Sequence, residues 1–169
     1  MALLTHRGVA IALLALCAAA HAEPLSDADL KIAFAYNFIV LATWPAETPP
    51  VLRFCVAGAA AGSKVFHVLG GKAALERTLS VANIASPERA VDCQVLYVAP
   101  AESGRLETWL AAVAGRPTLT ISEEAQFWGA VVNLRNLDGR IVFDVDTRAA
   151  ANARIVLSSQ LIKLAASRQ

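Results

Sequence analysis

Few side chains in this sequence have the types and spacing that chemistry requires. His67 is the only histidine beyond the first 22 residues. One histidine cannot form a multi-histidine metal site, and Cys55 and Cys93 lack the close spacing of a zinc knuckle. A triad of serine, His67 and aspartate is possible by composition, but no Gly-x-Ser-x-Gly segment supports it. Beside Phe66 and Val68, a structural histidine is the better interpretation.

Two pairs of carboxylates, Asp144 with Asp146 and Glu123 with Glu124, are the next candidates for acid and base chemistry. Neighbouring strand residues point to opposite faces, and acidic pairs commonly cap helices, so we interpret both pairs as structural. The glycine-containing segment 58–64 follows a predicted strand and could hold phosphate at a helix N-terminus. It has neither the dinucleotide nor the P-loop spacing, so a plain connection is the better interpretation. We therefore expect no enzyme activity, no cofactor and no metal.

The first 22 residues have the layout of a secretory signal peptide. A short basic region ends at Arg7, and an apolar run spans residues 9–20. The small residues Ala20 and Ala22 then form a cleavage site. We expect this segment to be removed during export to the periplasm.

Two alternatives apply to the same segment: a retained membrane anchor and lipidation at Cys17. The apolar run has 12 residues, whereas a bilayer-spanning helix takes about 20. Leu16 is bulky where a lipoprotein cleavage site requires a small residue. The export interpretation is therefore preferred, with residues 23–169 forming one domain.

The charge balance of the exported chain excludes one class of partner. Without residues 1–22, 169 − 22 = 147 residues remain, a usual size for one domain. Loss of Arg7 leaves 14 basic and 14 acidic side chains, so the exported chain is formally neutral. Nucleic-acid binding requires a basic excess, so we expect no such partner.

Cys55 and Cys93 are the cysteines that stay in the exported chain, and each lies in a strand-like run. An even number of cysteines in an oxidising compartment predicts a disulfide that ties two strands or their ends. Such a bridge would stabilise the fold by roughly 3 to 4 kcal/mol in the chain-entropy model. Two buried thiols that merely pack are the alternative.

Apolar periodicity predicts alternating helices and strands before residue 130. A capping-box-like start at Ser26 opens a buried helix, which Trp44 and Pro45 end. Short β-rich runs predict strands over residues 51–57, 75–84, 91–99 and 118–121. Helices are predicted over residues 64–69 and 102–114, and from residues 122–124 onward, where the last carries Phe127 and Trp128.

Asp138 and Gly139 join two β-rich runs and predict a hairpin, since both residue types tolerate positive φ values. A helix, an extended run and a capped final helix are predicted after it, over residues 147–152, over 154–156 and from Ser159. One unbroken helix over 147–167 is the alternative. The whole pattern predicts an α/β layered sandwich, with helices on both faces of a mixed, mostly parallel sheet and a C-terminal hairpin followed by a terminal helix.

Several segments, in this order along the chain, resemble the YfiR family. They are Tyr36-Asn37-Phe38 with Trp44-Pro45, residues 52–56, residues 92–98, residues 115–120, and the stretch from Asp138-Gly139-Arg140 to Ser158-Ser159-Gln160-Leu161. The resemblance covers nearly all of residues 23–169. The sequence departs from the family pattern at two places that bear on the identity of the partner. Residues 39–43 lack the lysine and glutamate common there, and Asn152-Ala153 replaces a glycine-containing break.

The best-known members of this family are small periplasmic repressors of a membrane-bound diguanylate cyclase. The resemblance therefore implies a non-enzymatic regulator that binds the cyclase's periplasmic domain and lowers cyclic di-GMP synthesis until redox or envelope stress releases it. The family's disulfide would fall on Cys55 and Cys93. Related proteins also occur beside histidine kinases and transport receptors. A periplasmic small-ligand sensor with a cleft at the strand ends is therefore the alternative, and a homodimer stays open.

Five residues are predicted to contact a partner or ligand: Tyr36, Asn37, Trp44, Arg140 and Asp144. Amphipathic aromatic side chains suit such contacts. The competing interpretation is that Trp44 only covers the end of its helix, as Phe34 and Phe38 pack in the core. A hydrolase is a third interpretation; it requires an essential His67, and we expect His67 to be dispensable.

Overall fold

The computed structural model describes residues 26–58, 61–126 and 129–169. Its strands are β1 Ala42–Thr43, β2 Val51–Ala57, β3 Ala73–Ala74, β4 Arg77–Ile84, β5 Val95–Val98, β6 Leu119–Glu123, β7 Val132–Leu137, β8 Arg140–Val145, β9 Val156–Leu157 and β10 Ser167–Arg168. Its helices are α1 Asp27–Val40, α2 Leu106–Ala112, α3 Thr147–Asn152 and α4 Ser159–Leu164, with 3₁₀ segments η1 Ala61–Leu69, η2 Pro87–Asp92 and η3 Pro100–Arg105. The predicted signal peptide, Phe127 and Trp128 lie outside the described residues.

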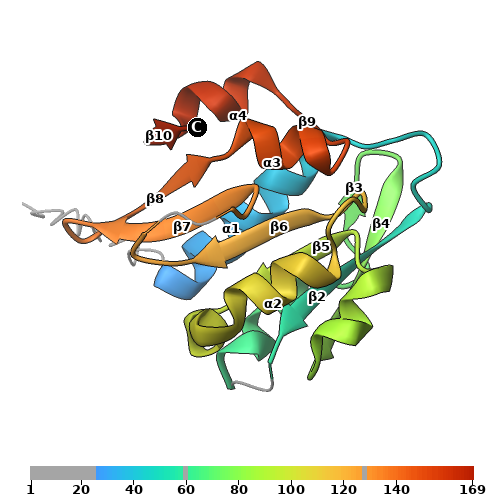
Figure 1. Cartoon of the computed structure of the whole chain (residues 1–169), viewed down its shortest axis with the longest axis horizontal. Helices are drawn as coiled ribbons and strands as arrows, with labels where there is room; N and C mark the ends of the chain where they lie inside the picture. Colours follow the sequence, from blue (N-terminus) through green and yellow to red (C-terminus); the bar gives the residue numbers. More distant parts are fainter. Residues whose placement is uncertain (1–25, 59–60, 127–128) are drawn as a thin grey trace, which may run out of the picture.

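Eight strands form one sheet in the order β10-β8-β7-β6-β5-β2-β4-β3 (Figure 1). Five adjacent strands, β7, β6, β5, β2 and β4, are parallel to one another. β3 is antiparallel to β4, β8 is antiparallel to β7, and β10 is parallel to β8. β1 and β9 form a separate antiparallel pair. The predicted mixed, mostly parallel sheet is thus confirmed.

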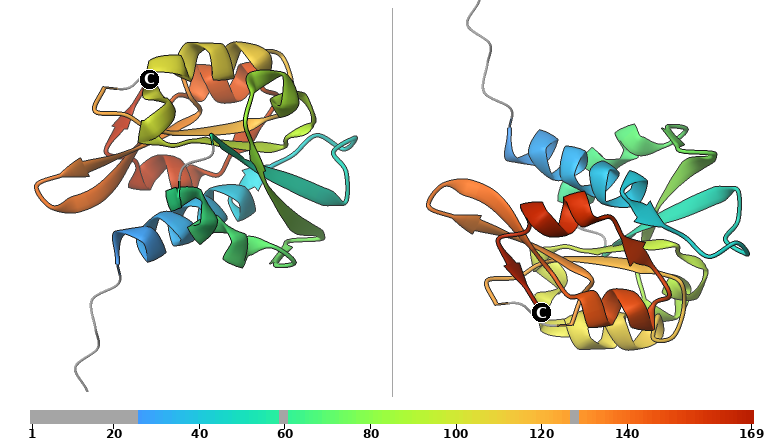
Figure 2. Two further views of the ribbon diagram at one scale, coloured as in Figure 1. Left: turned by 90° about the horizontal axis from the view of Figure 1, so that it is seen from below. Right: turned by 90° about the horizontal axis from the view of Figure 1, so that it is seen from above.

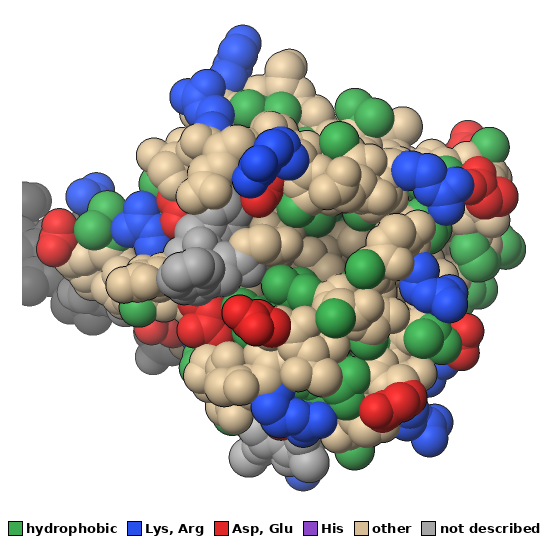
Figure 3. Space-filling view, in the orientation of Figure 1, with side chains coloured by type: hydrophobic (Ala, Val, Ile, Leu, Met, Phe, Trp, Pro, Cys, Tyr) green, Lys and Arg blue, Asp and Glu red, His purple; other side chains and the backbone are tan. Residues whose placement is uncertain are grey.

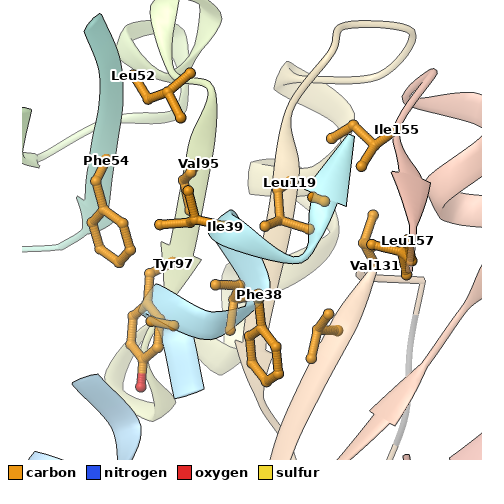
Figure 4. Packing of buried hydrophobic residues seen from close by; sticks show 14 of the residues in the cluster. Phe38, Ile39, Leu52, Phe54, Val95, Tyr97, Leu119, Val131, Ile155 and Leu157 are labelled. Carbon is orange, nitrogen blue, oxygen red and sulfur yellow. The ribbon is translucent and has the colours of Figure 1, made fainter. Parts of the chain in front are cut away.

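Helical segments cover both faces of this sheet, as predicted. Figure 2 shows α1, η1 and α4 on one face and α2, η2 and α3 on the other. On the α1 face, Phe38, Phe54 and Tyr97 belong to one large apolar cluster (Figure 4). On the α2 face, Trp109 and the two cysteines form a smaller cluster. Burial of these two side-chain layers is the main apolar stabilisation of the sandwich.

α1 begins with the predicted capping box. Ser26 Oγ accepts a hydrogen bond from Asp29 N at 3.1 Å, and the Asp29 carboxylate accepts one from Ser26 N at 3.3 Å. The helix ends at Val40, however, rather than at the predicted Trp44 and Pro45. After the turn residue Leu41, Ala42 and Thr43 form β1, and Thr43 pairs with Val156 of β9. A strand pairing with the distant C-terminal region ends this helix before the proline does.

Three other boundaries differ from the sequence prediction. The strand predicted over 75–84 begins only at Arg77, because a turn that places Leu75 at φ 57° separates β4 from the short strand β3 before it. The strand predicted over 91–99 is shortened to β5, since η2 occupies its first residues. Ser122 and Glu123 belong to β6 and do not open a helix, because they pair with Asn133 and Leu134 of β7.

The C-terminal region contains the predicted hairpin, and two separate helices follow it in place of one long helix. Asp138 and Gly139 adopt φ values of 51° and 78°, and Leu137 pairs with Arg140. α3 and α4 are separate, so the unbroken helix is wrong. The cap of α4 is Ser158 rather than Ser159, since Ser158 Oγ accepts from Leu161 N at 3.2 Å. The predicted terminal helix is followed by one further strand, β10.

Candidate functional site

A pocket of about 410 Å³ lies at the carboxyl ends of β2, β5 and β6. Its lining includes Lys31 of α1, Phe66 of η1, Tyr97 of β5 and Glu123 of β6. We call it the strand-end pocket. The carboxyl ends of parallel strands are the usual ligand-binding edge of an open α/β sheet. This location makes the pocket the candidate site for a small ligand.

Glu123 is the polar centre of the strand-end pocket. Its Oε2 lies 2.5 Å from Lys31 Nζ, and its Oε1 accepts a hydrogen bond from the Tyr97 hydroxyl. The Glu123 side chain is 13% exposed and that of Lys31 is 29% exposed. Charge-assisted hydrogen bonds of this kind are stronger than neutral ones. The three side chains thus connect α1 to the ends of two neighbouring strands.

Aromatic rings form the apolar side of the same pocket. The Phe66 and Tyr97 rings have centroids 4.3 Å apart, and Phe66 stacks on Phe54 at 5.3 Å. Figure 4 shows Phe54 and Tyr97 on neighbouring strands with their rings on the same face of the sheet. Offset and tilted ring contacts at these distances are favourable. The pocket combines an aromatic wall with one partly buried ion pair, which suits a small ligand with an apolar ring and one polar group.

Asp144, one of the predicted contact residues, is instead part of a buried polar network. Arg135 donates to both its carboxylate oxygens, at 2.7 and 3.2 Å, and Ser167 Oγ donates to Oδ1 at 2.7 Å. Burial acts to raise the pKa of Asp144, but the hydrogen bonds from Arg135 and Ser167 outweigh it and hold the pKa below its usual range. Asp144 is 2% exposed, so its side chain stabilises β10 against β8 and does not reach a partner.

Glu123 and Glu124 lie in different surroundings. The sequence analysis expected the pair to cap a helix, but neither residue does so. Asn133 fixes the backbone of Glu124 through hydrogen bonds to its N–H at 2.9 Å and its carbonyl at 3.0 Å. Glu124 Oε1 is buried without a hydrogen-bond partner among the described residues. Burial, and then the charge of Glu123, raise the pKa of Glu124. The pair therefore consists of one ion-paired and one poorly solvated carboxyl group.

Cys55 and Cys93 are joined by a disulfide, the pairing that the sequence analysis expects. The bridge connects β2 to Cys93, which follows η2 and precedes β5, with the Cα atoms 5.9 Å apart. Both cysteines are at most 2% exposed and pack with Trp109. Thr118 Oγ1 donates to the Cys93 carbonyl at 2.7 Å. The bridge is thus an internal part of the α2 face.

The other predicted contact residues do not form one cluster. The Tyr36 hydroxyl donates to the Ala73 carbonyl at 2.7 Å, and Asn37 and Arg140 are exposed. Trp44 is 8% exposed, and its Nε1 donates to the Ile39 carbonyl at 3.3 Å. Trp44 therefore covers the end of α1, as in the competing interpretation. No hydrogen bond or ion pair in the described chain joins any two of the five predicted residues, and contact through Tyr36, Asn37 and Arg140 stays a prediction.

His67 and Gly58 do not line the strand-end pocket, and residues 59–60 of the glycine-containing segment lie outside the described residues. His67 is exposed on η1, and its ring makes no hydrogen bond within the part of the chain that is described. Gly58 has φ 86°, and a Cβ there would lie 2.7 Å from the Glu102 carboxylate, which would repel a phosphate group. Across residues 26–58, 61–126 and 129–169, no group of three metal-ligating side chains is found. None of the helices in these ranges has the length and apolar character needed to cross a bilayer.

The sequence analysis did not predict the site that Lys31, Tyr97 and Glu123 form. Lys31 and Glu123 are 92 residues apart, by 123 − 31, and no sequence pattern links them. One signal was available: Tyr97 is the only hydroxyl-bearing residue within β5, and a buried tyrosine hydroxyl usually has a partner. That partner could not be named without the order of the strands.

The face that carries α2 and α3 has a second hollow, of about 470 Å³, between these helices. Its lining is mostly small and apolar, and Arg116 is its only charged residue. Basic side chains are spread around the periphery of this face rather than gathered in one patch (Figure 3). The hollow therefore offers little specific chemistry compared with the strand-end pocket.

Comparisons with known proteins agree with this fold. A family model described as YfiR/HmsC-like matches residues 28–166. No curated protein matches the chain. Among solved structures, a conserved domain protein from Vibrio cholerae O1 biovar El Tor is similar, with a TM-score of 0.52 and 11% sequence identity. The alignment covers 86% of this chain and 61% of that one, so this chain spans about three fifths of its length, and the similarity is one of fold.

Proposed function

Since the chain belongs to the YfiR/HmsC-like family, whose members are periplasmic regulators, we propose that it represses an inner-membrane diguanylate cyclase. In this proposal it is exported, binds the cyclase's periplasmic domain and holds the cyclase in an inactive arrangement. The observation that carries the proposal is the family match over residues 28–166, which includes nearly the whole described chain. A regulatory role is the coarser statement that the family supports directly.

Repression requires that the protein bind the inactive state of the cyclase more tightly than the active state, because a ligand shifts an equilibrium only by its differential affinity. The exposed residues Asn37 and Arg140 and the half-buried Tyr36 are the predicted contacts that remain accessible. The hairpin that carries Arg140 extends beyond the body of the sheet (Figure 1), which suits it to reach a partner.

The disulfide gives this proposal a mechanism of release. Cys55 lies in β2 and Cys93 lies before β5, and both contribute to the apolar cluster under α2. Reduction would remove the cross-link and loosen the packing of η2 and α2 on the sheet. We propose that this loosening lowers affinity for the cyclase, so that a reducing or envelope-damaging stress raises cyclic di-GMP.

The test is capture of membrane proteins by the exported form of the full chain, purified from its host. Detergent-solubilised inner membranes are passed over the immobilised protein, and bound proteins are identified by mass spectrometry. A diguanylate cyclase should be recovered, and dithiothreitol should release it. In parallel, deletion of the gene should raise cellular cyclic di-GMP, and the intact gene should restore the low level.

The matched controls separate repression from its redox release. Cys55→Ser should repress poorly, whereas His67→Ala should repress like the unaltered protein. Unchanged cyclic di-GMP after deletion, together with recovery of only a histidine kinase or transport receptor, would refute the cyclase as the target. Full repression and full stability of Cys55→Ser would refute the redox step alone.

A second candidate function is a periplasmic small-ligand sensor that acts with a histidine kinase or transport receptor. The strand-end pocket favours it, because the pocket has an aromatic wall, a polar centre and a volume of about 410 Å³. Thermal unfolding with a panel of aromatic metabolites tests it. A ligand at about 100 times its dissociation constant adds about 2.7 kcal/mol to the free energy of unfolding. Glu123→Gln should abolish such a shift if the pocket is the site.

A further inference from the structure

A further hollow, of about 480 Å³, lies at the amino ends of β2, β5 and β6. Its lining includes Val51, the first residue of β2, and Gln94 and Thr118, which directly precede β5 and β6. We call it the amino-end pocket. The strand-end pocket lies at the opposite ends of the same three strands, so the two pockets are separate. The volume of the amino-end pocket is in the range of small-molecule sites.

Polar side chains on neighbouring strands form the floor of the amino-end pocket. Arg53 is two residues before Cys55, which packs in the cluster under α2, so side-chain alternation places Arg53 on the α2 face. Ser80 of β4 pairs in register with Arg53 and lines the pocket beside it. On the other side of β2, Gln94 Oε1 accepts a hydrogen bond from Arg53 N at 2.9 Å. A row of polar residues thus crosses β4, β2 and the start of β5.

Two guanidinium groups line this pocket beside the same short segment of chain. Arg53 Nη1 lies 4.0 Å from Asp92 Oδ2, and Arg116 Nη1 donates to the Val91 carbonyl at 3.1 Å. Neither group makes a further hydrogen bond or ion pair with a described residue. A guanidinium group has five N–H donors, so most of the donors of both arginines are free for a ligand.

The lining of the amino-end pocket has a net charge of +1. It contains two arginines and a single acidic residue, Asp92. The Asp92 side chain is 75% exposed, and 4.0 Å from Arg53 it is too far for a hydrogen bond. An exposed ion pair of this kind contributes little free energy. A ligand with one negative charge therefore neutralises the pocket and competes easily with Asp92.

Apolar side chains lie at the edge of this polar floor. Pro49, Val51 and Pro117 line the pocket, and Val51 is 47% exposed. A short apolar chain attached to the anion would remove part of this surface from water. A phosphate monoester carries nearly two negative charges, so it would leave one charge without a partner. The planar carboxylate, which arginine binds through two parallel hydrogen bonds, fits the pocket better.

We propose that the amino-end pocket binds a carboxylate group attached to a short apolar chain. Arg53 and Arg116 hold the carboxylate, Ser80 and Gln94 add hydrogen bonds, and the apolar chain lies over Val51. The site goes beyond the proposed function, because it depends neither on the cyclase nor on the strand-end pocket.

The test is an NMR titration of the exported form of the full chain, labelled with the nitrogen isotope that NMR detects. Hexanoate should shift the amide signals of Ser80, Gln94 and Thr118, whereas hexanamide, which has the same shape and no charge, should not. Inorganic phosphate should bind more weakly than hexanoate. Acetyl-alanyl-leucine carries its carboxylate at a peptide end, so the tighter of the two carboxylates identifies a free acid or a peptide terminus as the source.

Substitutions separate the two arginines from general attraction by positive charge. Arg53→Gln and Arg116→Gln should each raise the dissociation constant of hexanoate roughly tenfold or more, because each removes charge-assisted hydrogen bonds. Arg148→Gln, on α3 and outside this pocket, removes the same charge and should leave the constant within about twofold. Asp92→Asn should lower the constant by roughly two- to fivefold, since Arg53 loses its competing carboxylate.

Arg116 lies in an exposed loop, so Arg116→Gln keeps the proposal testable if Arg53→Gln impairs folding. Tighter binding by Asp92→Asn together with a loss in Arg116→Gln would support the site. Absence of hexanoate binding, equal binding of hexanamide, or tighter binding of phosphate would overturn the proposal. An equal loss in Arg148→Gln, or shifts confined to Lys31, Tyr97 and Glu123, would also overturn it, because the ligand would then be held by general charge or by the strand-end pocket.

Discussion

The β10 edge of the sheet is fastened by side chains, whereas the β4 edge ends in outward backbone groups. At the β10 edge, Arg135 and Ser167 both bond the buried Asp144, and Gln169 N donates to Val145 O at 3.0 Å. At the β4 edge, residues 78–87 are uncharged, and most of the outer edge has no neighbouring strand among the described residues. One edge is closed by specific polar contacts and the other stays open.

The difference shows two ways of holding an edge strand. β10 has two residues and needs its polar network, because so short a strand gains little from its own ladder. β4 has eight residues, all but one of which pair with β2, and β2 itself is cross-linked to the residues before β5. The stability of the β4 edge therefore comes from inside the sheet, through the pairing with β2 and the disulfide.

The largest expected effect is on the internal support of the β4 edge. Replacing both Cys55 and Cys93 by serine should lower the free energy of unfolding by roughly 3 to 4 kcal/mol, because the cross-link no longer restricts the unfolded chain. Urea denaturation measures the change. The unaltered protein in dithiothreitol should match the variant, and a loss below about 1 kcal/mol would contradict the internal support of this edge.

The next effect concerns the network at the opposite edge. Asp144→Asn should lower the free energy of unfolding by about 3 kcal/mol, because it leaves the partly buried Arg135 without its carboxylate partner. Hydrogen exchange should report early opening of β10, with β4 unaffected. Asp138→Asn in the exposed hairpin turn removes the same charge and should be near neutral. Equal losses in the two variants would show that net charge, rather than the network, is responsible.

The same carboxyl predicts how stability depends on pH. The folded-state pKa of Asp144 is lowered from its ordinary value of 3.8, so the unfolded chain takes up a proton first as the pH falls. Its contribution is fully present above the unfolded-state pKa and is lost as the pH falls through the folded-state pKa. Urea midpoints measured from pH 6 to pH 2 should therefore fall less steeply for Asp144→Asn. Parallel pH profiles for the two proteins would contradict the network's role.

Local patterns were sufficient to predict the parts of the fold that local chemistry determines. Asp138 and Gly139 predicted the hairpin through their tolerance of positive φ, and Ser26 predicted the start of α1 through its capping box. The alternation of strands and helices predicted the layered sandwich. Errors occurred where distant segments pair. The end of α1 depends on β9, and Glu123 belongs to β6 because that strand pairs with β7.

The candidate site was less accessible to sequence reasoning than the fold. The strand-end pocket depends on Lys31, Tyr97 and Glu123, which only the order β6-β5-β2 and the position of α1 bring together. Asp144 was chosen for its charge on a hairpin, yet its partner Ser167 lies on a strand that the sequence did not predict. Apolar periodicity specifies which residues are buried, and it does not specify which polar side chains meet.

The smallest expected effects come from single side chains at the β10 edge and at the β4 edge. Ser167→Ala should lower the free energy of unfolding by about 1 kcal/mol, because Asp144 loses one hydrogen bond. Ala82→Lys should change it by less than about 0.5 kcal/mol, since residue 82 lies on an open edge and the lysine chain can extend into solvent. Thermal and urea unfolding of both variants beside the unaltered protein measure the two values. If Ala82→Lys lowers the free energy of unfolding by more than Ser167→Ala does, the β4 edge is closed by contacts of its own side chains, and the distinction between the two edges fails.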